Sequence, residues 1–312
     1  MSFIEAYKKI LQQGYTKVIC RYDSVKGNYE YLPFLHAHNE TWKDDLVDVL
    51  INNLLNYCYE PYEIEALYKP NISQLKKYIN NAIRVRLNKK TTQEQKDGLC
   101  GELLLDLILR IENQNNKLLL CRPKYQQLGS RAELKNYDAL LFREEAQNIS
   151  LILGQVKTGG YNYCTSNLET DLNTKYNSTY FGDAVCYIAD RRMLDCPSLA
   201  LQNILRQINE IAMATDDMQT RNDKICEYIK NNHIKIEIPC LMFYEKNTLY
   251  NSTNDIILQL DKEIEKVKNY FDTKSFNISN FDYIISFYVF PAKSITELRK
   301  SLMDYKKEVL HG

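Results

Sequence analysis

At 312 residues, the chain is long enough to bury a substantial core as one large domain or two smaller ones. Its 45% apolar and 26% charged residues are an ordinary balance for a soluble globular protein, and no apolar run approaches the roughly 20 residues that cross a bilayer. Forty Lys and Arg residues balance forty Asp and Glu residues, which argues against broad electrostatic binding of nucleic acid but leaves a local basic cleft open.

Nine cysteines are scattered through the chain and bear on its compartment. Their number is odd, none forms a C-x-x-C pair, and the N-terminus has no charged-then-apolar signal pattern. We therefore expect reduced thiols in a cytoplasmic protein that has no zinc ribbon.

Residues 1–95 predict a mixed N-terminal α/β region, which is a candidate for binding a partner. Residues 15–22 are predicted to form a strand. Residues 41–57 carry apolar side chains at a helical period and are predicted to form a helix. Two further helices are predicted here: 63–68 and 72–87.

The second region, residues 96–312, is predicted to alternate between helices and strands. Its clearest helix covers 97–111, because apolar side chains fall on one face. A loop rich in Gly, Asn and Tyr is expected over 158–180, and Pro239 is expected to break a later strand. The other segments are strands 117–122, 137–144, 149–157, 234–244 and 282–290, and helices 198–214, 254–270 and 294–309. This order favours a mixed α/β sheet flanked by helices.

Four polar residues in this second region suggest a metal-dependent nuclease core. Glu102 projects from a helix, and Asp138 lies near the start of a strand. The next strand ends in a Gln155-x-Lys157 pair. Magnesium or manganese needs hard oxygen ligands, which Glu102, Asp138 and Gln155 would supply. Lys157 would position or activate water and stabilise charge on the phosphate, which completes the predicted catalytic set.

Gln155 departs from the pattern of PD-(D/E)xK nucleases, in which a helix acid and a strand acid precede an acid-x-lysine pair. A glutamine offers a neutral oxygen and removes one charge from the site, which weakens the argument for a metal. Such triplets also arise by chance, so the strand context and the Gly101-Glu102 helix carry the prediction. The alternative for Glu102 is a surface or capping role.

Other polar residues are weaker candidates for binding. Lys124 and Arg131 flank a predicted hairpin near the site and are our candidates for contact with nucleic-acid phosphates. His36 and His38 could present both rings on one face of a strand, but no Cys or His cluster accompanies them. A structural or surface role is therefore favoured for the two histidines.

The segment 96–105 (KDGLCGELLL) resembles the Gly-Glu-Leu-Leu helix of the HamA family, the small subunit of the Hachiman anti-phage system. In that family a strand with Asp and then a Gly-acid-x-Lys strand follow, and Asp138 and residues 154–157 occupy those places. The segments 238–244 (IPCLMFY) and 284–291 (IISFYVFP) also look similar. The resemblance covers roughly residue 40 to the end.

This resemblance implies a nuclease subunit that pairs with a large helicase, HamB, and degrades DNA when the helicase senses abnormal or damaged DNA. We therefore expect a restriction-endonuclease-like mixed sheet flanked by helices, with N- and C-terminal elaborations. With zero net charge, the protein is expected to need a partner to hold DNA. Two alternatives stay open: a non-catalytic module of the same fold that regulates a helicase, and a restriction or repair nuclease.

Overall fold

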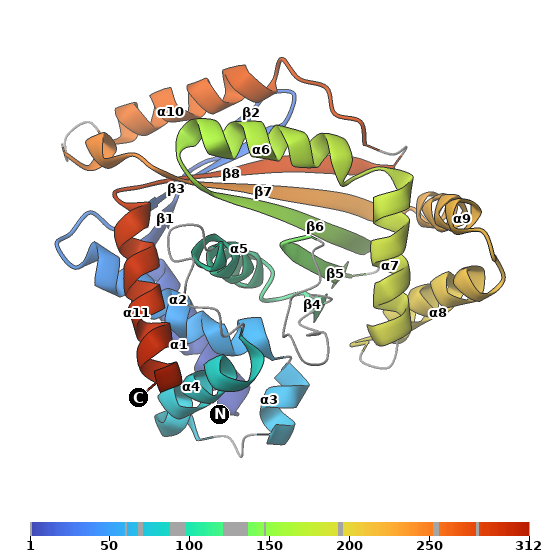
Figure 1. Ribbon diagram of the computed structural model, residues 1–312, viewed down its shortest axis with the longest axis horizontal. Helices are drawn as coiled ribbons and strands as arrows, with labels where there is room; N and C mark the ends of the chain where they lie inside the picture. Colours follow the sequence, from blue (N-terminus) through green and yellow to red (C-terminus); the bar gives the residue numbers. More distant parts are fainter. Residues whose placement is uncertain are drawn as a thin grey trace.

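An eight-stranded mixed sheet lies at the centre of the molecule, with helices on both faces (Figure 1). This computed structural model describes residues 2–59, 61–67, 71–87, 98–120, 137–146, 148–192, 196–251, 256–278 and 281–311. The arrangement confirms the predicted α/β class with a mixed sheet flanked by helices.

The sheet has the strand order β1-β3-β8-β7-β6-β5-β4, and β2 pairs with β3 beside this path. The strands are β1 (Ile19–Arg21), β2 (Val25–Lys26), β3 (Glu30–His36), β4 (Lys117–Leu120), β5 (Ala139–Glu145), β6 (Asn148–Gly159), β7 (Lys235–Glu245) and β8 (Tyr283–Ala292). The central strands β3, β8, β7 and β6 are parallel, and the other pairings are antiparallel. The sheet therefore runs across residue 95, and a domain boundary there stays a prediction.

Two helical layers cover the two faces of the sheet and bury separate cores. The first layer holds α1 (Phe3–Val18), α2 (Trp42–Cys58), α3 (Pro61–Leu67), α4 (Leu75–Arg86), α5 (Leu99–Glu112) and α11 (Ile295–His311). The second holds α6 (Tyr161–Thr174), α7 (Ser178–Arg192), α8 (Leu199–Met213), α9 (Met218–Asn231) and α10 (Ile256–Phe271). Short 3-10 turns occur at Ile72–Gln74 and Asn247–Tyr250.

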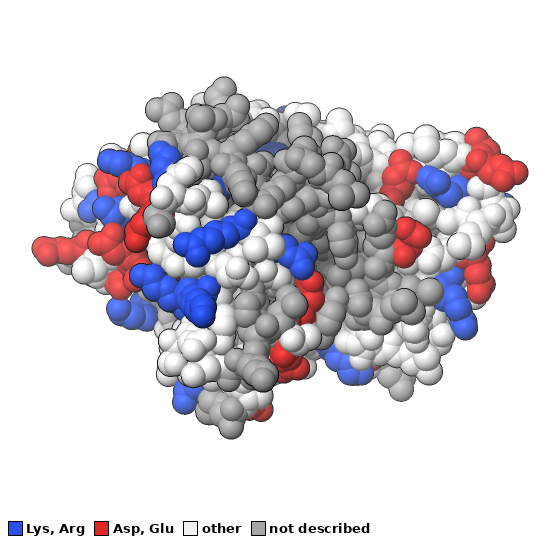
Figure 2. Space-filling view, turned by 60° about the horizontal axis from the view of Figure 1, so that its bottom comes forward, with Lys and Arg blue, Asp and Glu red and all other residues white. Residues whose placement is uncertain are grey.

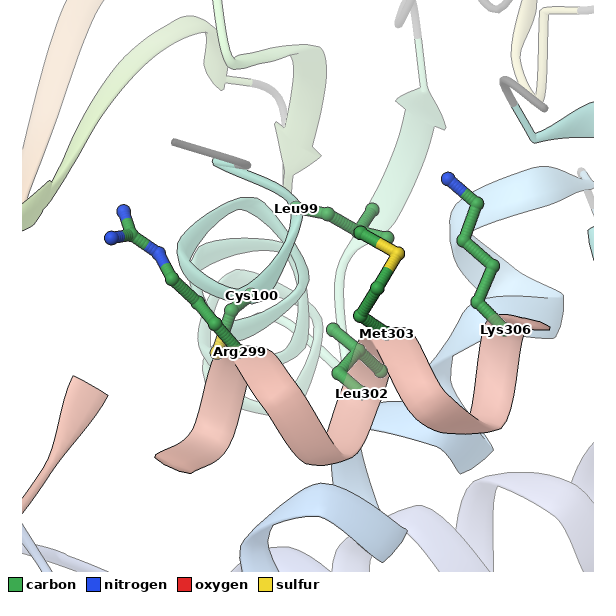
Figure 3. Close-up of a pocket in the computed structure, with 6 residues that line it drawn as sticks. All are labelled: Leu99, Cys100, Arg299, Leu302, Met303 and Lys306. Atoms are coloured by element: carbon green, nitrogen blue, oxygen red, sulfur yellow. The ribbon is translucent and has the colours of Figure 1, made fainter. Parts of the chain in front are cut away.

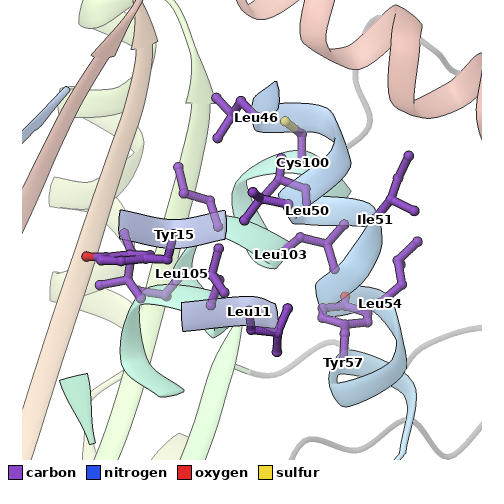
Figure 4. Close-up of a cluster of buried hydrophobic side chains, with 14 of the residues drawn as sticks. Leu11, Tyr15, Leu46, Leu50, Ile51, Leu54, Tyr57, Cys100, Leu103 and Leu105 are labelled. Carbon is purple, nitrogen blue, oxygen red and sulfur yellow. The ribbon is translucent and has the colours of Figure 1, made fainter. Parts of the chain in front are cut away.

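Helix α5 is enclosed between the sheet and the other helices of the first layer. Leu103, Leu105 and Leu107 are all fully buried, because apolar side chains cover most of the circumference of this helix and such a helix belongs inside a core. Figure 4 shows side chains of α1 and α2, among them Leu11 and Leu50, packed around this helix. The packing fixes the position of everything that α5 carries, including Glu102.

The strand predicted over 15–22 is wrong in its first half, because α1 extends to Val18 and only Ile19–Arg21 is a strand. Helix α1 begins with a capping box between Ser2 and Glu5. The helical period of its buried side chains then continues through Tyr15 and outweighs the short apolar run.

The loop predicted over 158–180 is also wrong. Strand β6 continues to Gly159, and α6 and α7 fill most of the segment. Cys164, Leu168 and Leu172 recur at a spacing of four residues and are fully buried, which anchors α6 to the sheet. The many Ser, Thr and Asn side chains donate hydrogen bonds to carbonyls one helical turn earlier, so they do not break the helix.

Pro239 does not break its strand, because β7 is continuous from Lys235 to Glu245. The proline meets Gly154 on the neighbouring β6, where an added Cβ would lie 3.3 Å from Pro239 Cγ. The ladder between β6 and β7 passes from Ile152 opposite Glu237 to Gln155 opposite Cys240. A glycine on the adjacent strand makes room for the proline ring in the centre of the sheet.

Candidate active site

The candidate site lies where β5 begins and β6 approaches its end. The Asp138 N–H donates to the Gly154 carbonyl at 2.9 Å, and the Asp138 carboxylate accepts from the Val156 N–H at 2.8 Å. These two bonds fix the acid against β6, directly beside the Gln155-x-Lys157 segment. The predicted strand acid and the predicted lysine strand are therefore neighbours in the sheet.

Side-chain alternation sets the direction of Gln155 and Lys157. On β6, Ile152 and Val156 contribute to the core of the first helical layer, whereas Leu151 and Leu153 contribute to the core beneath α6 and α7. Because successive side chains alternate between faces, Gln155 and Lys157 point to the side of α6.

Glu102 approaches from the other side, in the first turn of α5. The positive end of the helix dipole favours a carboxylate there. The Tyr57 hydroxyl donates a hydrogen bond to the Glu102 carboxylate. Glu102 is near enough to Asp138 that its charge disfavours ionisation of that second acid.

The pKa of Asp138 is raised by its surroundings. Burial, followed by the negative charge of Glu102, raises the pKa of Asp138 to about 6, against the opposing effects of the Val156 N–H and of Lys157. Two mutually repelling carboxylates in a low-dielectric setting are stabilised by a divalent cation, so the electrostatics fit a metal.

Lys157 is paired with an acid that the sequence did not indicate. Its ammonium lies 2.6 Å from the Asp171 carboxylate of α6, and both side chains are largely buried. Burial alone would lower the pKa of Lys157, but the charges of Asp171 and Asp138 raise it above its ordinary value. At neutral pH the side chain is therefore an ammonium, which can donate to a phosphate or orient water but cannot act as a base.

Gln155 is fully buried, and its side-chain oxygen is already engaged. Its Oε1 accepts a hydrogen bond from Lys175 Nζ at 3.0 Å, and Lys175 also lies 3.0 Å from Asp171. Its Nε2 has no hydrogen-bond partner among the described residues. A metal at this oxygen would have to replace Lys175, so Gln155 as a metal ligand stays a prediction.

Helix α11 contacts the far end of β6. Arg299 donates to the Thr158 carbonyl at 2.6 Å, one residue beyond Lys157. Figure 3 shows Arg299, Leu302 and Met303 of α11 next to Leu99 and Cys100 at the start of α5. This contact joins the C-terminal helix, the helix that carries Glu102 and the strand that carries Lys157.

The structure brings Glu102, Asp138, Gln155 and Lys157 to one place in the fold. The predicted phosphate contacts Lys124 and Arg131 lie outside the described residues. Sequence reasoning missed four residues that shape the site: Tyr57, Asp171, Lys175 and Arg299. The helical spacing of apolar residues over 164–172 was the signal that could have placed the acid and the lysine of α6 on the sheet-facing side.

The two histidines have structural partners. The buried His36 ring accepts the Lys293 N–H at 3.1 Å and stacks against Trp42 and Tyr250. Burial lowers the pKa of His36 to about 4. His38 is bonded to the Tyr250 carbonyl at 2.7 Å. These contacts agree with the structural role favoured for both residues.

Glu102 and Asp138 are the two carboxylates of the candidate site that could serve as oxygen ligands of a metal. In the part of the chain that the structure describes, no group of three or more His, Cys, Asp or Glu residues could hold an ion. Magnesium commonly binds through one or two carboxylates and takes its remaining ligands from water and substrate phosphates. A magnesium ion held by Glu102 and Asp138 would therefore need a phosphate and water to complete its shell.

On the face in Figure 2, Lys and Arg side chains of the described residues are interspersed with Asp and Glu side chains. This mixture agrees with the zero formal net charge. Among the helices of the described ranges, none is both long and apolar enough for a bilayer crossing.

The chain was compared with models of known protein families. The HamA family model matches residues 15–305, which include all four predicted site residues. No curated protein sequence matches the chain.

Proposed function

The chain belongs to the HamA family, which associates it with Hachiman anti-phage defence, and we propose that it is the metal-dependent DNA nuclease subunit of a defence complex. In this complex it works with a helicase that resembles HamB. The observation that carries the proposal is that Asp138, at the start of β5, is hydrogen-bonded to Val156 of β6 and lies near enough to Lys157 for their charges to interact. An acid and an ammonium fixed side by side, with Glu102 opposite, are the groups that phosphodiester hydrolysis requires.

In this proposal Glu102 and Asp138 hold magnesium or manganese, with water and a DNA phosphate as the other ligands. The bound metal would supply Lewis-acid stabilisation of the phosphate and a more acidic water. Lys157, kept charged by Asp171, donates to a phosphate oxygen and stabilises the charge that develops there. Gln155 accepts a hydrogen bond from Lys175 and so helps to position the charged side chains of the site. In this role it does not contact the metal.

The principal alternative is a non-catalytic module that regulates a helicase. One observation favours it: the Gln155 oxygen and the Lys157 ammonium both have partners within the protein. The two proposals differ in what Asp138→Asn does to defence, because a module that does not cut DNA has no need of a metal-binding acid.

The test is phage plating on cells that carry the chain with its helicase partner. For a nuclease, we expect Asp138→Asn and Lys157→Met each to restore plating to the level of undefended cells. The matched controls Asp261→Asn and Lys262→Met change exposed residues of α10 and should leave defence intact. Full defence by Asp138→Asn at normal protein abundance would favour the non-catalytic module instead.

A further inference from the structure

Helix α6 places one charged side chain, Asp171, on its buried side. Cys164, Leu168 and Leu172 of this helix are fully buried against the sheet, and Asp171 lies among them with only 9% of its surface exposed. An ionised group on the inner face of a helix needs partners, because isolated burial of its charge is strongly unfavourable.

The partners of Asp171 belong to the candidate site. Its carboxylate contacts Lys157 Nζ at 2.6 Å and Lys175 Nζ at 3.0 Å. Lys175 in turn donates to the Gln155 oxygen. The Tyr137 hydroxyl donates to the Lys175 carbonyl at 2.6 Å, which fastens the end of α6 next to Asp138. Gln155 and Lys157 of β6 are thus connected through Lys175 and Asp171, which both lie outside this strand.

The charge count on this face explains why an acid is needed at position 171. Lys157 and Lys175 provide two positive charges, and Asp138 provides one negative charge when ionised. Gln155 is neutral, so Asp171 supplies the second negative charge. A glutamate at position 155 would supply that charge from the strand.

We infer that Asp171 is a positioning residue of the nuclease site, which supplies from α6 the negative charge that Gln155 lacks and so fixes the ammonium of Lys157 beside Asp138. This inference rests on the proposed nuclease function. Lys175 links the two ends of the arrangement, since it contacts both the helix acid and the strand amide. The acid contacts no reacting atom and acts through the lysine.

The first test needs no enzymatic activity and uses the full chain. We would compare the melting temperatures of wild type, Asp171→Asn, Lys157→Met and the double variant. Each single variant removes one member of the buried pair and leaves the charge of the other less well balanced, so we expect the double variant to melt no lower than the less stable single variant. Additive losses would overturn the ion-pair role, whether or not the protein cuts DNA.

The second test moves the acid from the helix to the strand. With linear DNA and magnesium, we expect Asp171→Asn to lower kcat by about 10- to 100-fold while KM stays within about threefold of wild type. Adding Gln155→Glu to Asp171→Asn should restore kcat at least partly, by about tenfold, because the introduced carboxylate would again balance Lys175 and Lys157. Asp261→Asn, at an exposed position of α10, is the matched control.

The outcomes separate the inference from the proposed function. A wild type that leaves DNA intact while the melting temperatures are non-additive would remove the nuclease proposal and keep the ion pair. A wild type that cuts, with Asp171→Asn equally fast or faster, would overturn the positioning role. If Asp171→Asn alone does not fold, the variant that also carries Gln155→Glu is still expected to fold and to cut, and its failure in both would also count against the inference.

Discussion

Asp138 shows how function and stability oppose each other in one side chain. Its carboxyl is buried near Glu102, and the raised pKa of Asp138 means that the folded protein resists ionising it. Above its pKa of about 6 the folded state therefore carries an unfavourable charge, which is relieved as the pH falls toward the ordinary value of the acid.

We predict that Asp138→Asn stabilises the protein in metal-free buffer at pH 8. Asparagine can still accept the Val156 N–H but carries no charge, so the gain should be about 1–3 kcal/mol. The gain should shrink as the pH falls from about 6 toward 4, because wild type then protonates Asp138. Urea unfolding at pH 8 and at about pH 4 measures the difference in stability between wild type and Asp138→Asn, with Asp261→Asn as the control. An Asp138→Asn protein less stable than wild type at pH 8 would contradict this prediction.

The same residue predicts a response to magnesium. Because a cation relieves the repulsion between Glu102 and Asp138, magnesium should raise the melting temperature of wild type. Asp138→Asn should lose most of this increase, and Asp261→Asn should keep it. An equal increase in all three proteins would place the ion elsewhere.

At the scale of elements, the sequence predicted strongly periodic segments well and missed those fixed by tertiary contacts. The clear apolar periods over α2, α5 and α11 match the structure closely. Helix α6 was missed because Ser, Thr and Asn make up much of its composition, while only three buried apolar side chains tie it to the sheet. Because this segment was predicted as a loop, Asp171 and Lys175 were not predicted as site residues. An acid in a loop gives no reason to expect a buried ion pair.

The chain order of the four predicted residues could be read from the sequence, but their partners could not. Glu102 sits on a helix with a clear apolar period, and Asp138 and Lys157 sit beside apolar runs that predict two successive strands, so we expected the three residues to approach one another. The role of Gln155 depends on Lys175, which lies 20 positions away and reaches it only through the docking of α6. Short motifs contain no information on such long-range contacts.

Helix α5 predicts a steric test of how Glu102 is placed. A Cβ added at Gly101 would lie 2.6 Å from Val156 Cγ1 and closer still to Thr158 Oγ1, so the helix would have to move away from β6. We expect Gly101→Ala to destabilise the protein by about 1–3 kcal/mol and to weaken its response to magnesium. Gly160→Ala is the matched control, since an added Cβ there meets nothing within 4 Å. Equal stability of both variants would show that α5 is not held as closely as described.

At the scale of the whole molecule, the charge balance bears on the proposed partnership with a helicase. The chain has no net charge, and the face in Figure 2 mixes both signs. DNA affinity without sequence readout comes mainly from contacts between basic side chains and phosphates. A nuclease site on a protein with this charge balance would depend on a second protein that binds the phosphate backbone of DNA, as the proposed helicase would.

We therefore predict weak binding of DNA by the chain alone. Fluorescence anisotropy with a labelled duplex at physiological salt should give a Kd of about 10⁻⁶ M or weaker. Adding the helicase partner should tighten the binding of DNA by the complex. A Kd for the chain alone far below this range would show that its own surface holds DNA.

The proposed nuclease site is tested most sharply by cleavage of linear DNA by the full chain, alone and with its helicase partner, in magnesium and in EDTA. We predict magnesium-dependent degradation by wild type that Asp138→Asn and Lys157→Met reduce by at least about 100-fold, while Asp261→Asn and Lys262→Met cut as wild type does. Degradation that persists in EDTA, or that is the same in wild type and Asp138→Asn, would contradict the assignment of Glu102, Asp138 and Lys157 as the nuclease site.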